Sequence, residues 1–238
     1  MKLTERQEKI LDIVVREYVD SAQPVSSQVL RKKHNLDISP ATIRTEMQKL
    51  TDKGFLSQPH TSAGRVPADK GYRFFVNNLL NREKPFDAAQ GKELAVADWG
   101  GNEAEDTFKF IQNLTRRLAA ETRTLALNYI ENEDVFWKEG WEEVLREPEF
   151  EERDNIIDFT RLLENFEEHI GDKKKEQGLS VYIGGENPYP KAKNFTVISS
   201  SYHLPNGERG VISIIGPKRM EYGKNISLIN SLLRLLRD

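Results

Sequence analysis

One side of the segment that follows Ser39 carries side chains that could read nucleic-acid bases. Ile43, Met47 and Leu50 have the i, i+4, i+7 spacing of a buried helical stripe, which leaves the opposite side open to solvent. The side chains of this open side are Thr42, Arg44, Thr45, Gln48 and Lys49. Thr, Arg and Gln side chains can hydrogen-bond the edges of bases in the major groove of DNA. These residue types therefore predict base recognition.

Both ends of this helix carry local signals. Ser39 is a good N-cap, and Pro40 suits the first helical position because its missing N–H would have no intrahelical partner there. Gly54 stands where a residue in the left-handed conformation is needed to end the helix. We therefore expect a helix that begins at Pro40 and is terminated by Gly54.

A polar and basic loop follows the helix. Phe55 and Leu56 are expected to form a short strand anchored in the core, and residues 58–65 are polar and rich in turn formers. Such a loop can lay His60 and Arg65 on phosphates or in a minor groove, contacts that give affinity more than sequence choice. The alternative is an ordinary surface hairpin.

Further helices are expected on both sides of these elements. Thr4 is a plausible N-cap of a helix over residues 4–20, and Ser26 or Ser27 can cap a second, short helix. Another helix is expected to begin near Asp69. Two short helices joined by a tight turn and followed by a hairpin match a winged helix-turn-helix domain, which we expect over residues 1–82.

Charge is unevenly distributed along the 238 residues. Residues 1–85 carry 15 Lys+Arg against 10 Asp+Glu, residues 86–178 carry 12 against 24, and residues 179–238 carry 8 against 4. A basic head on an acidic body suits a nucleic-acid-binding protein, although charge varies along any chain.

Several classes of function are disfavoured by the composition. The chain has no cysteine, which excludes disulfides, thiolate chemistry and Cys-type zinc sites. The sequence has no apolar run as long as a membrane-spanning helix, about 18 residues, and no signal-peptide pattern. We therefore expect a cytoplasmic protein without a membrane segment. The four histidines are scattered, and neither a phosphate-binding glycine loop nor HExxH is present. We expect no catalytic residues, cofactor or metal, and hence no enzyme.

The middle of the chain has a helical spacing of apolar residues. After a linker over residues 83–103, we expect a helical region over 104–178. Spacings of three and four place one series on a single seam: Phe108, Ile111, Thr115, Leu118, Thr122, Leu125 and Tyr129. This seam either packs on the core of its own domain or forms a dimer interface. Trp137 and Trp141 continue the helical periodicity.

The pattern changes to strands from Leu179. Residues 179–184, 194–203 and 208–215 are rich in Val, Ile, Ser and Tyr, with the hairpin signal Asn206-Gly207 between the last two segments. A closing helix is expected after Pro217. We expect this C-terminal part, residues 179–238, to be a small α+β unit.

Three groups of sequence strings resemble one bacterial family. The chain resembles the heat-inducible transcription repressors of the HrcA family in PVSSQVL, SPATIRTEM and QPHTSAGRVPADKGYRFFV, then in EVLREPEFEERDNI, and finally in the stretch from IGGENPYP to KNISLI. These strings occur in the order of the family. The chain is identified as a shortened member, in which the stretch before EVLREPEF is expected to lack much of the family's sheet.

The resemblance implies an α+β protein with an N-terminal winged helix-turn-helix domain, a helical middle region and a C-terminal GAF-like domain. It implies a homodimer that represses chaperone operons, binds an inverted-repeat operator and is modulated by the chaperonin GroEL. On this reading the residues expected to read bases are Ser39, Thr42, Arg44, Thr45 and Gln48. Those expected on phosphates are Ser26, Ser27, Lys49, Arg65 and Lys70, and His60 and Thr61 of the loop are expected to bind DNA as well.

Two alternatives remain at this stage. One is a small-molecule-responsive winged-helix regulator that senses through its C-terminal domain. The other is a chaperonin-interacting module without operator binding.

Overall fold

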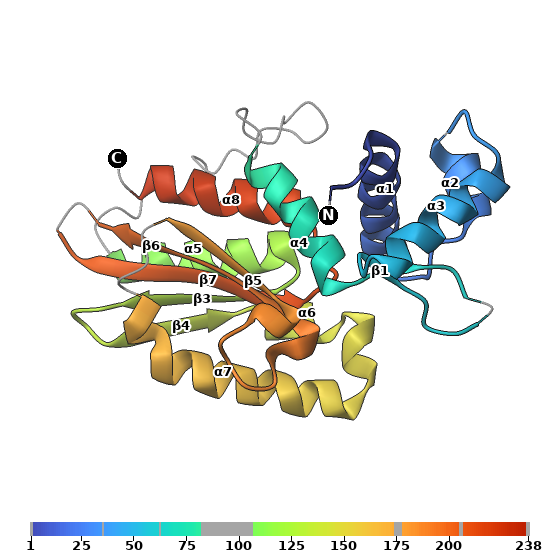
Figure 1. Cartoon of the computed structure of the whole chain (residues 1–238). Helices are drawn as coiled ribbons and strands as arrows, with labels where there is room; N and C mark the ends of the chain where they lie inside the picture. Colours follow the sequence, from blue (N-terminus) through green and yellow to red (C-terminus); the bar gives the residue numbers. More distant parts are fainter. Residues whose placement is uncertain are drawn as a thin grey trace. The chain divides into compact units, whose positions relative to one another are not determined.

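The computed structural model describes residues 2–34, 36–61, 63–81, 107–173, 178–204 and 207–236. The chain forms two compact units, Met1–Arg82 and Glu83–Asp238, both of which combine helices with strands (Figure 1). The α+β class is therefore confirmed. The expected linker over residues 83–103 lies outside the described residues. Among the helices of the described ranges, none is long and apolar enough to cross a membrane.

The first unit contains four helices and one short hairpin among its described residues. In chain order these are α1 (Glu5–Ser21), α2 (Ser27–His34), α3 (Pro40–Asp52), β1 (Leu56–Ser57), β2 (Val66–Pro67) and α4 (Asp69–Leu80). The two strands pair antiparallel, with Leu56 opposite Pro67.

The predicted caps of α1 and α3 are confirmed. The Thr4 hydroxyl accepts a hydrogen bond from the Gln7 N–H at 3.3 Å, and the Gln7 side chain accepts one from the Thr4 N–H at 3.4 Å. At α3 the Ser39 hydroxyl accepts from the Thr42 N–H at 3.1 Å, with Pro40 in the first turn. Gly54, just beyond the helix, has the expected positive φ of 78°. Both helices are therefore fixed by local sequence.

The stripe predicted for α3 is also confirmed as core. Ile43 and Leu50 are fully buried and Met47 is nearly so, and they pack within a core that α1 and α4 complete. Gly71 allows α4 to approach the backbone of Phe55 closely, because a Cβ on it would lie 2.2 Å from the carbonyl oxygen of Phe55.

The second unit is built on one five-stranded antiparallel sheet. Its strands are β3 (Leu125–Ile130), β4 (Val135–Glu139), β5 (Leu179–Ile183), β6 (Phe195–His203) and β7 (Arg209–Pro217), in the spatial order β4-β3-β7-β6-β5. The helices are α5 (Thr107–Thr122), α6 (Trp141–Leu145), α7 (Arg153–Lys173) and α8 (Tyr222–Leu235), with 3-10 turns at Pro148–Glu151, Gly184–Glu186 and Ala192–Asn194.

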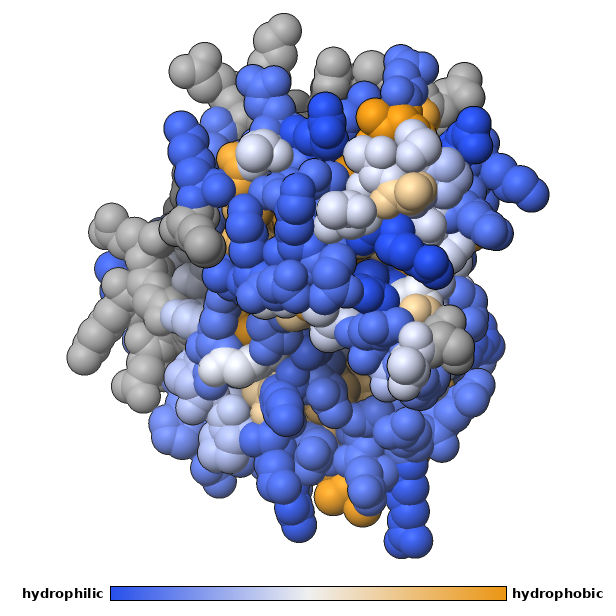
Figure 2. All heavy atoms as spheres, turned by 45° about the vertical axis from the view of Figure 1, so that its right-hand side comes forward, coloured by the Kyte–Doolittle hydropathy of each residue, from blue (hydrophilic) through white to orange (hydrophobic). Residues whose placement is uncertain are grey.

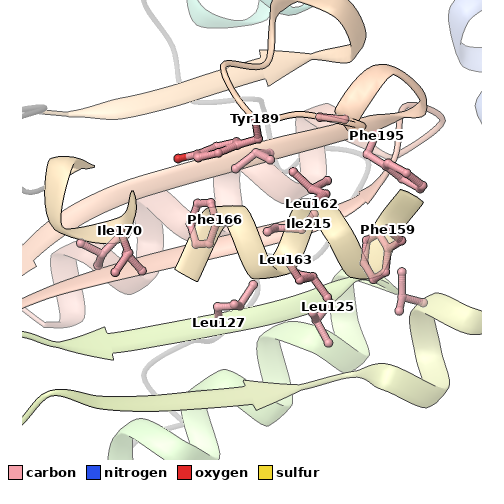
Figure 3. Packing of buried hydrophobic residues seen from close by; sticks show 14 of the residues in the cluster. Leu125, Leu127, Phe159, Leu162, Leu163, Phe166, Ile170, Tyr189, Phe195 and Ile215 are labelled. Carbon is pink, nitrogen blue, oxygen red and sulfur yellow. The ribbon is translucent and has the colours of Figure 1, made fainter. Parts of the chain in front are cut away.

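Helices cover both faces of this sheet. Helix α7 lies on one face, and its residues Phe159, Leu163 and Phe166 pack on Leu125 and Leu127 of β3 (Figure 3). Helices α5 and α8 lie on the other face, where α5 contacts β3 and β4 and α8 contacts β6 (Figure 1). The unit therefore has a hydrophobic core on each side of its sheet.

The helical seam expected over residues 108–129 is wrong beyond Thr122. Helix α5 ends there, Arg123 adopts a positive φ of 53°, and Leu125–Ile130 forms β3. Trp137 likewise lies in a strand, β4. Ile111 of α5 is fully buried within its own unit, as the alternative of packing on the domain's own core requires.

The expected separation of residues 104–178 from 179–238 is also corrected. Strand β3 pairs with β7 over six residues, from Leu125 opposite Ile215 to Ile130 opposite Gly210, so both segments belong to one sheet. The stretch expected to lack much of its sheet supplies β3 and β4. The three strands and the closing helix predicted after residue 178 are confirmed, whereas Asn206 of the expected turn lies outside the described residues.

We predict that Leu162→Ala lowers the free energy of unfolding of the second unit by about 2–5 kcal/mol, because Leu162 is fully buried in α7 and its loss leaves a cavity. Leu145→Ala is the matched control, since that side chain is 43% exposed and its loss should cost well under about 1 kcal/mol. Urea unfolding followed by tryptophan fluorescence reports this unit, because all three tryptophans lie beyond residue 82. Equal losses for the two variants would contradict the assignment of the core.

Candidate nucleic-acid interface

An open groove of about 950 Å³ lies in the first unit between the start of α2, the exposed side of α3 and the loop of the β1–β2 hairpin. Its lining is polar and basic where the sequence predicted binding residues. Eight of the twelve predicted side chains line it: Ser26, Ser27, Arg44, Thr45, Gln48, Lys49, Thr61 and Arg65. The groove therefore gathers residues from three separate segments of the chain.

The other four predicted residues lie elsewhere in the first unit. Ser39 and Thr42 bond to each other at the start of α3, with 3.0 Å between their hydroxyl oxygens. His60 is exposed at the hairpin tip. Lys70 donates to the carbonyl oxygen of Lys53 at 2.9 Å, and its ammonium lies 4.4 Å from the centre of the Phe55 ring. The ammonium of Lys70 is thus directed at its own unit.

Arg44 differs from the other basic side chains of the groove. It is exposed on α3, and within the described residues it makes no hydrogen bond or ion pair. All five N–H donors of its guanidinium are therefore available to a ligand. An arginine in this state can bind a guanine edge or a phosphate in a bidentate manner.

The hairpin is held in place by backbone pairing with the residue that precedes α2. Val25 and Arg65 exchange two backbone hydrogen bonds, of 2.9 and 2.8 Å. Gly64 makes this approach possible, because a Cβ on it would lie 2.4 Å from the Val25 carbonyl oxygen. The hairpin loop is closed from within by Gln58, whose amide donates to the carbonyl oxygens of Thr61 and Ala63 at 2.9 and 3.0 Å.

The side chain of Arg65 is bonded to α3. Its Nε donates to the Thr51 hydroxyl at 3.0 Å, and one terminal nitrogen donates to Oε1 of Gln48 at 2.8 Å. The amide nitrogen of Gln48 in turn donates to Oδ1 of Asp52 at 2.8 Å. Sequence reasoning missed this chain of contacts, because the direction of Arg65 depends on where the hairpin folds.

A second polar network joins α3 to α1. Gln7 donates from its amide nitrogen to the buried Glu46 at 2.9 Å and accepts from the Lys53 ammonium at 2.8 Å. Lys49 donates to the other oxygen of Glu46, also at 2.9 Å. The hydrogen bond from Lys49, followed by that from Gln7, holds the pKa of Glu46 below its ordinary value. Sequence reasoning missed both Gln7 and Glu46; the only signal was a polar residue at each of two otherwise core-facing positions.

The surface shown in Figure 2 carries no large hydrophobic patch. The face drawn in Figure 2 is mostly hydrophilic, and its hydrophobic side chains form small separate spots. Within the described ranges, no group of three or more His, Asp or Glu residues could hold a metal ion.

Comparisons with known proteins identify the class. The family model described as the HrcA protein C-terminal domain matches residues 76–226. A heat-inducible transcription repressor HrcA from a Thermoanaerobacter species is 28% identical, over all of this chain and 97% of its own length. The HrcA repressor of Natranaerobius thermophilus is 27% identical over 96% of this chain and 94% of its own length.

The fold has a counterpart of known structure. A crystal structure of a hypothetical protein superposes with a TM-score of 0.85, at 22% identity, over 99% of this chain and 98% of that one. At this identity the match concerns the fold alone.

These matches place the chain among transcription repressors rather than enzymes. The chain belongs to the HrcA family of heat-inducible transcription repressors. The alignment with the Thermoanaerobacter protein extends over 336 positions, more than the 238 residues of this chain, so that relative contains segments without a counterpart here.

We predict that Glu46→Gln destabilises the first unit at neutral pH and that the difference from the wild type shrinks in acid. The folded-state pKa of Glu46 is lowered, so its stabilising contribution is present above the ordinary carboxyl pKa and is lost as pH falls through the lowered value. Urea unfolding followed by circular dichroism at pH 7 and near pH 3 measures the difference, while tryptophan fluorescence monitors the second unit as an internal control. A difference that stays constant with pH would contradict an ionised Glu46 in the network.

Proposed function

We propose that the first unit is a winged helix-turn-helix head that binds double-stranded DNA. The observation that carries the proposal is the groove shared by α2, α3 and the hairpin, because it unites polar and basic side chains from all three segments. On this proposal α2 and α3 form the helix-turn-helix, α3 is the recognition helix in the major groove, and the β1–β2 hairpin is the wing.

The proposed contacts fall into two groups. Side chains on α3 and at its cap would read bases: Ser39, Thr42, Arg44, Thr45 and Gln48. Side chains around them would contact the DNA backbone: Ser26, Ser27, Lys49, His60 and Thr61. Arg65 and Lys70, expected on phosphates from the sequence, donate within the first unit instead and are not proposed as phosphate contacts. The start of α2 suits a phosphate, since the N–H groups of a first helical turn and the positive end of the helix dipole favour an anion.

The biological role follows from the family. As a member of a family of heat-inducible repressors, the protein is proposed to repress chaperone operons in the cytoplasm through an inverted-repeat operator. An inverted repeat requires two heads related by a two-fold axis, so the proposed active form is a homodimer.

The second unit is proposed to be a GAF-like domain that keeps clear of the DNA. It combines a five-stranded antiparallel sheet with helices on both faces, and residues 86–178 carry 24 Asp+Glu against 12 Lys+Arg. An acidic surface is repelled by phosphates, which leaves binding to the basic head.

Operator binding and its control are tested together. We expect the purified full chain to bind an inverted-repeat duplex from a chaperone promoter in a fluorescence anisotropy titration, with an affinity that falls as salt rises, by a slope of about −0.9 per phosphate contacted. Addition of chaperonin is expected to raise the fraction of active repressor. Absence of salt-sensitive binding, even with chaperonin present, would refute the proposed function and favour a protein-interaction module.

Arg44→Ala is expected to relax base preference at one position of each half-site and to weaken specific binding by about 1–3 kcal/mol, because all the donors of Arg44 are free for a base edge. Arg31→Ala is the matched control, since it removes an exposed arginine of α2 that does not line the groove. Competition titrations with single-base operator variants measure the preference. The assignment fails if Arg44→Ala loses as much affinity for random DNA as for the operator, or if Arg31→Ala relaxes the base preference to the same extent.

A further inference from the structure

The amide of Gln48 has an orientation that its two neighbours dictate. Its Oε1 accepts from the Arg65 guanidinium, and its Nε2 donates to the Asp52 carboxylate, both at 2.8 Å. A guanidinium can only donate and an ionised carboxylate can only accept. If the amide rotated by 180°, donor would face donor and acceptor would face acceptor. The order of the oxygen and the nitrogen is therefore fixed before any ligand binds.

Both the backbone and the side chain of Arg65 are held by hydrogen bonds. Its backbone is paired on both sides with Val25, and its Nε donates to the Thr51 hydroxyl at 3.0 Å. That hydroxyl donates to the carbonyl oxygen of Met47 within α3, at 2.9 Å. The planar guanidinium of Arg65 therefore links the hairpin to the Gln48 amide, so the position of the hairpin determines where the amide is held.

The bonded amide keeps one site of each kind for a ligand. An amide oxygen has two lone pairs and an amide nitrogen two hydrogens, and Arg65 and Asp52 use one of each. Gln48 is exposed and lines the groove, so the remaining acceptor and donor are available there. One acceptor beside one donor is the pair that binds N6 and N7 of adenine in the major groove.

We propose that Gln48 reads an adenine and that Arg65 and Asp52 are positioning residues that hold its amide for this contact. The proposal rests on DNA binding by α3, the proposed function above. It gives Arg65 a role in sequence preference that a phosphate contact would not have, because phosphates are the same at every base pair.

The two positioning residues carry opposite charges, so a positioning role can be distinguished experimentally from a general electrostatic effect on DNA affinity. Removal of the positive Arg65 lowers the affinity for any DNA, whereas removal of the negative Asp52 raises it. Loss of positioning acts in the same direction in both cases, because either change removes one of the two hydrogen bonds that hold the Gln48 amide in place. A shared loss of base preference with opposite changes of general affinity is therefore specific to the proposal.

The experiment selects duplexes from a pool of inverted repeats randomised in both half-sites, using the full-length wild type and the variants Gln48→Ala, Arg65→Ala and Asp52→Ala, followed by sequencing. The wild type is expected to require adenine at one position of each half-site. All three variants are expected to lose about tenfold in the preference for adenine at that position. Asp52→Asn is the matched control: Arg65 still holds Oε1 of Gln48, so the Asn amide turns its oxygen toward the Gln48 nitrogen and accepts from it, and the variant should retain the preference.

Titrations of each variant on random duplex complete the test. Arg65→Ala should bind random DNA more weakly than the wild type, and Asp52→Ala more tightly, while circular dichroism checks that each variant is folded. Since Asp52 is exposed, its variants are the safeguard if Arg65→Ala fails to fold. If Asp52→Ala or Gln48→Ala keeps the adenine preference of the wild type, the proposed role of Gln48 is wrong. The proposed DNA-binding function is unaffected by that result. A wild type that binds no duplex would instead refute the proposed function itself.

Discussion

Two backbone hydrogen bonds between Val25 and Arg65 determine how the candidate interface is assembled. Val25 lies just before α2, and Arg65 lies just before β2, so a single contact places the hairpin beside both helices. Because Gly64 lacks a Cβ, the two chains can approach closely enough to pair. Once they pair, the Arg65 side chain reaches α3, and the groove acquires its third wall. The geometry of the interface therefore depends on backbone pairing more than on any one of its side chains.

The sequence was sufficient to predict the ends of α3, because each end is determined by single residues that act on the adjacent backbone. Ser39, Pro40 and Gly54 each act on adjacent backbone, and the helix they delimit forms as expected. The contacts of Arg65 were not predictable in this way, since its partners on α3 lie 14 and 17 residues earlier in the chain. A long side chain on a hairpin can point toward DNA or back toward a helix, and only the tertiary fold decides between the two.

The error over residues 123–139 has a different physical cause. Leu125 and Tyr129 are four residues apart, a spacing that suits both one face of a helix and one face of a strand. Every residue of Leu125–Ile130 is buried, because helices cover both faces of the sheet, so the alternation typical of a strand is absent. The helix ends through Arg123 at a positive φ, without the glycine or proline that would have marked the boundary. Burial on both faces thus removed the periodic signal on which the prediction relied.

The intact sheet also constrains how this chain can be shorter than its relatives. The ladders from β4 to β5 pair residue by residue, so a segment added inside a strand would break the register and expose core residues such as Val197. Additional positions of the longer relatives therefore belong in the connections between elements, where a longer loop adds mainly the entropy of closure, about 0.6 kcal/mol for each doubling. A chain can lose such a segment and keep its core unchanged. Shortening of this kind leaves the paired strands of the second unit and the groove of the first unit as they are.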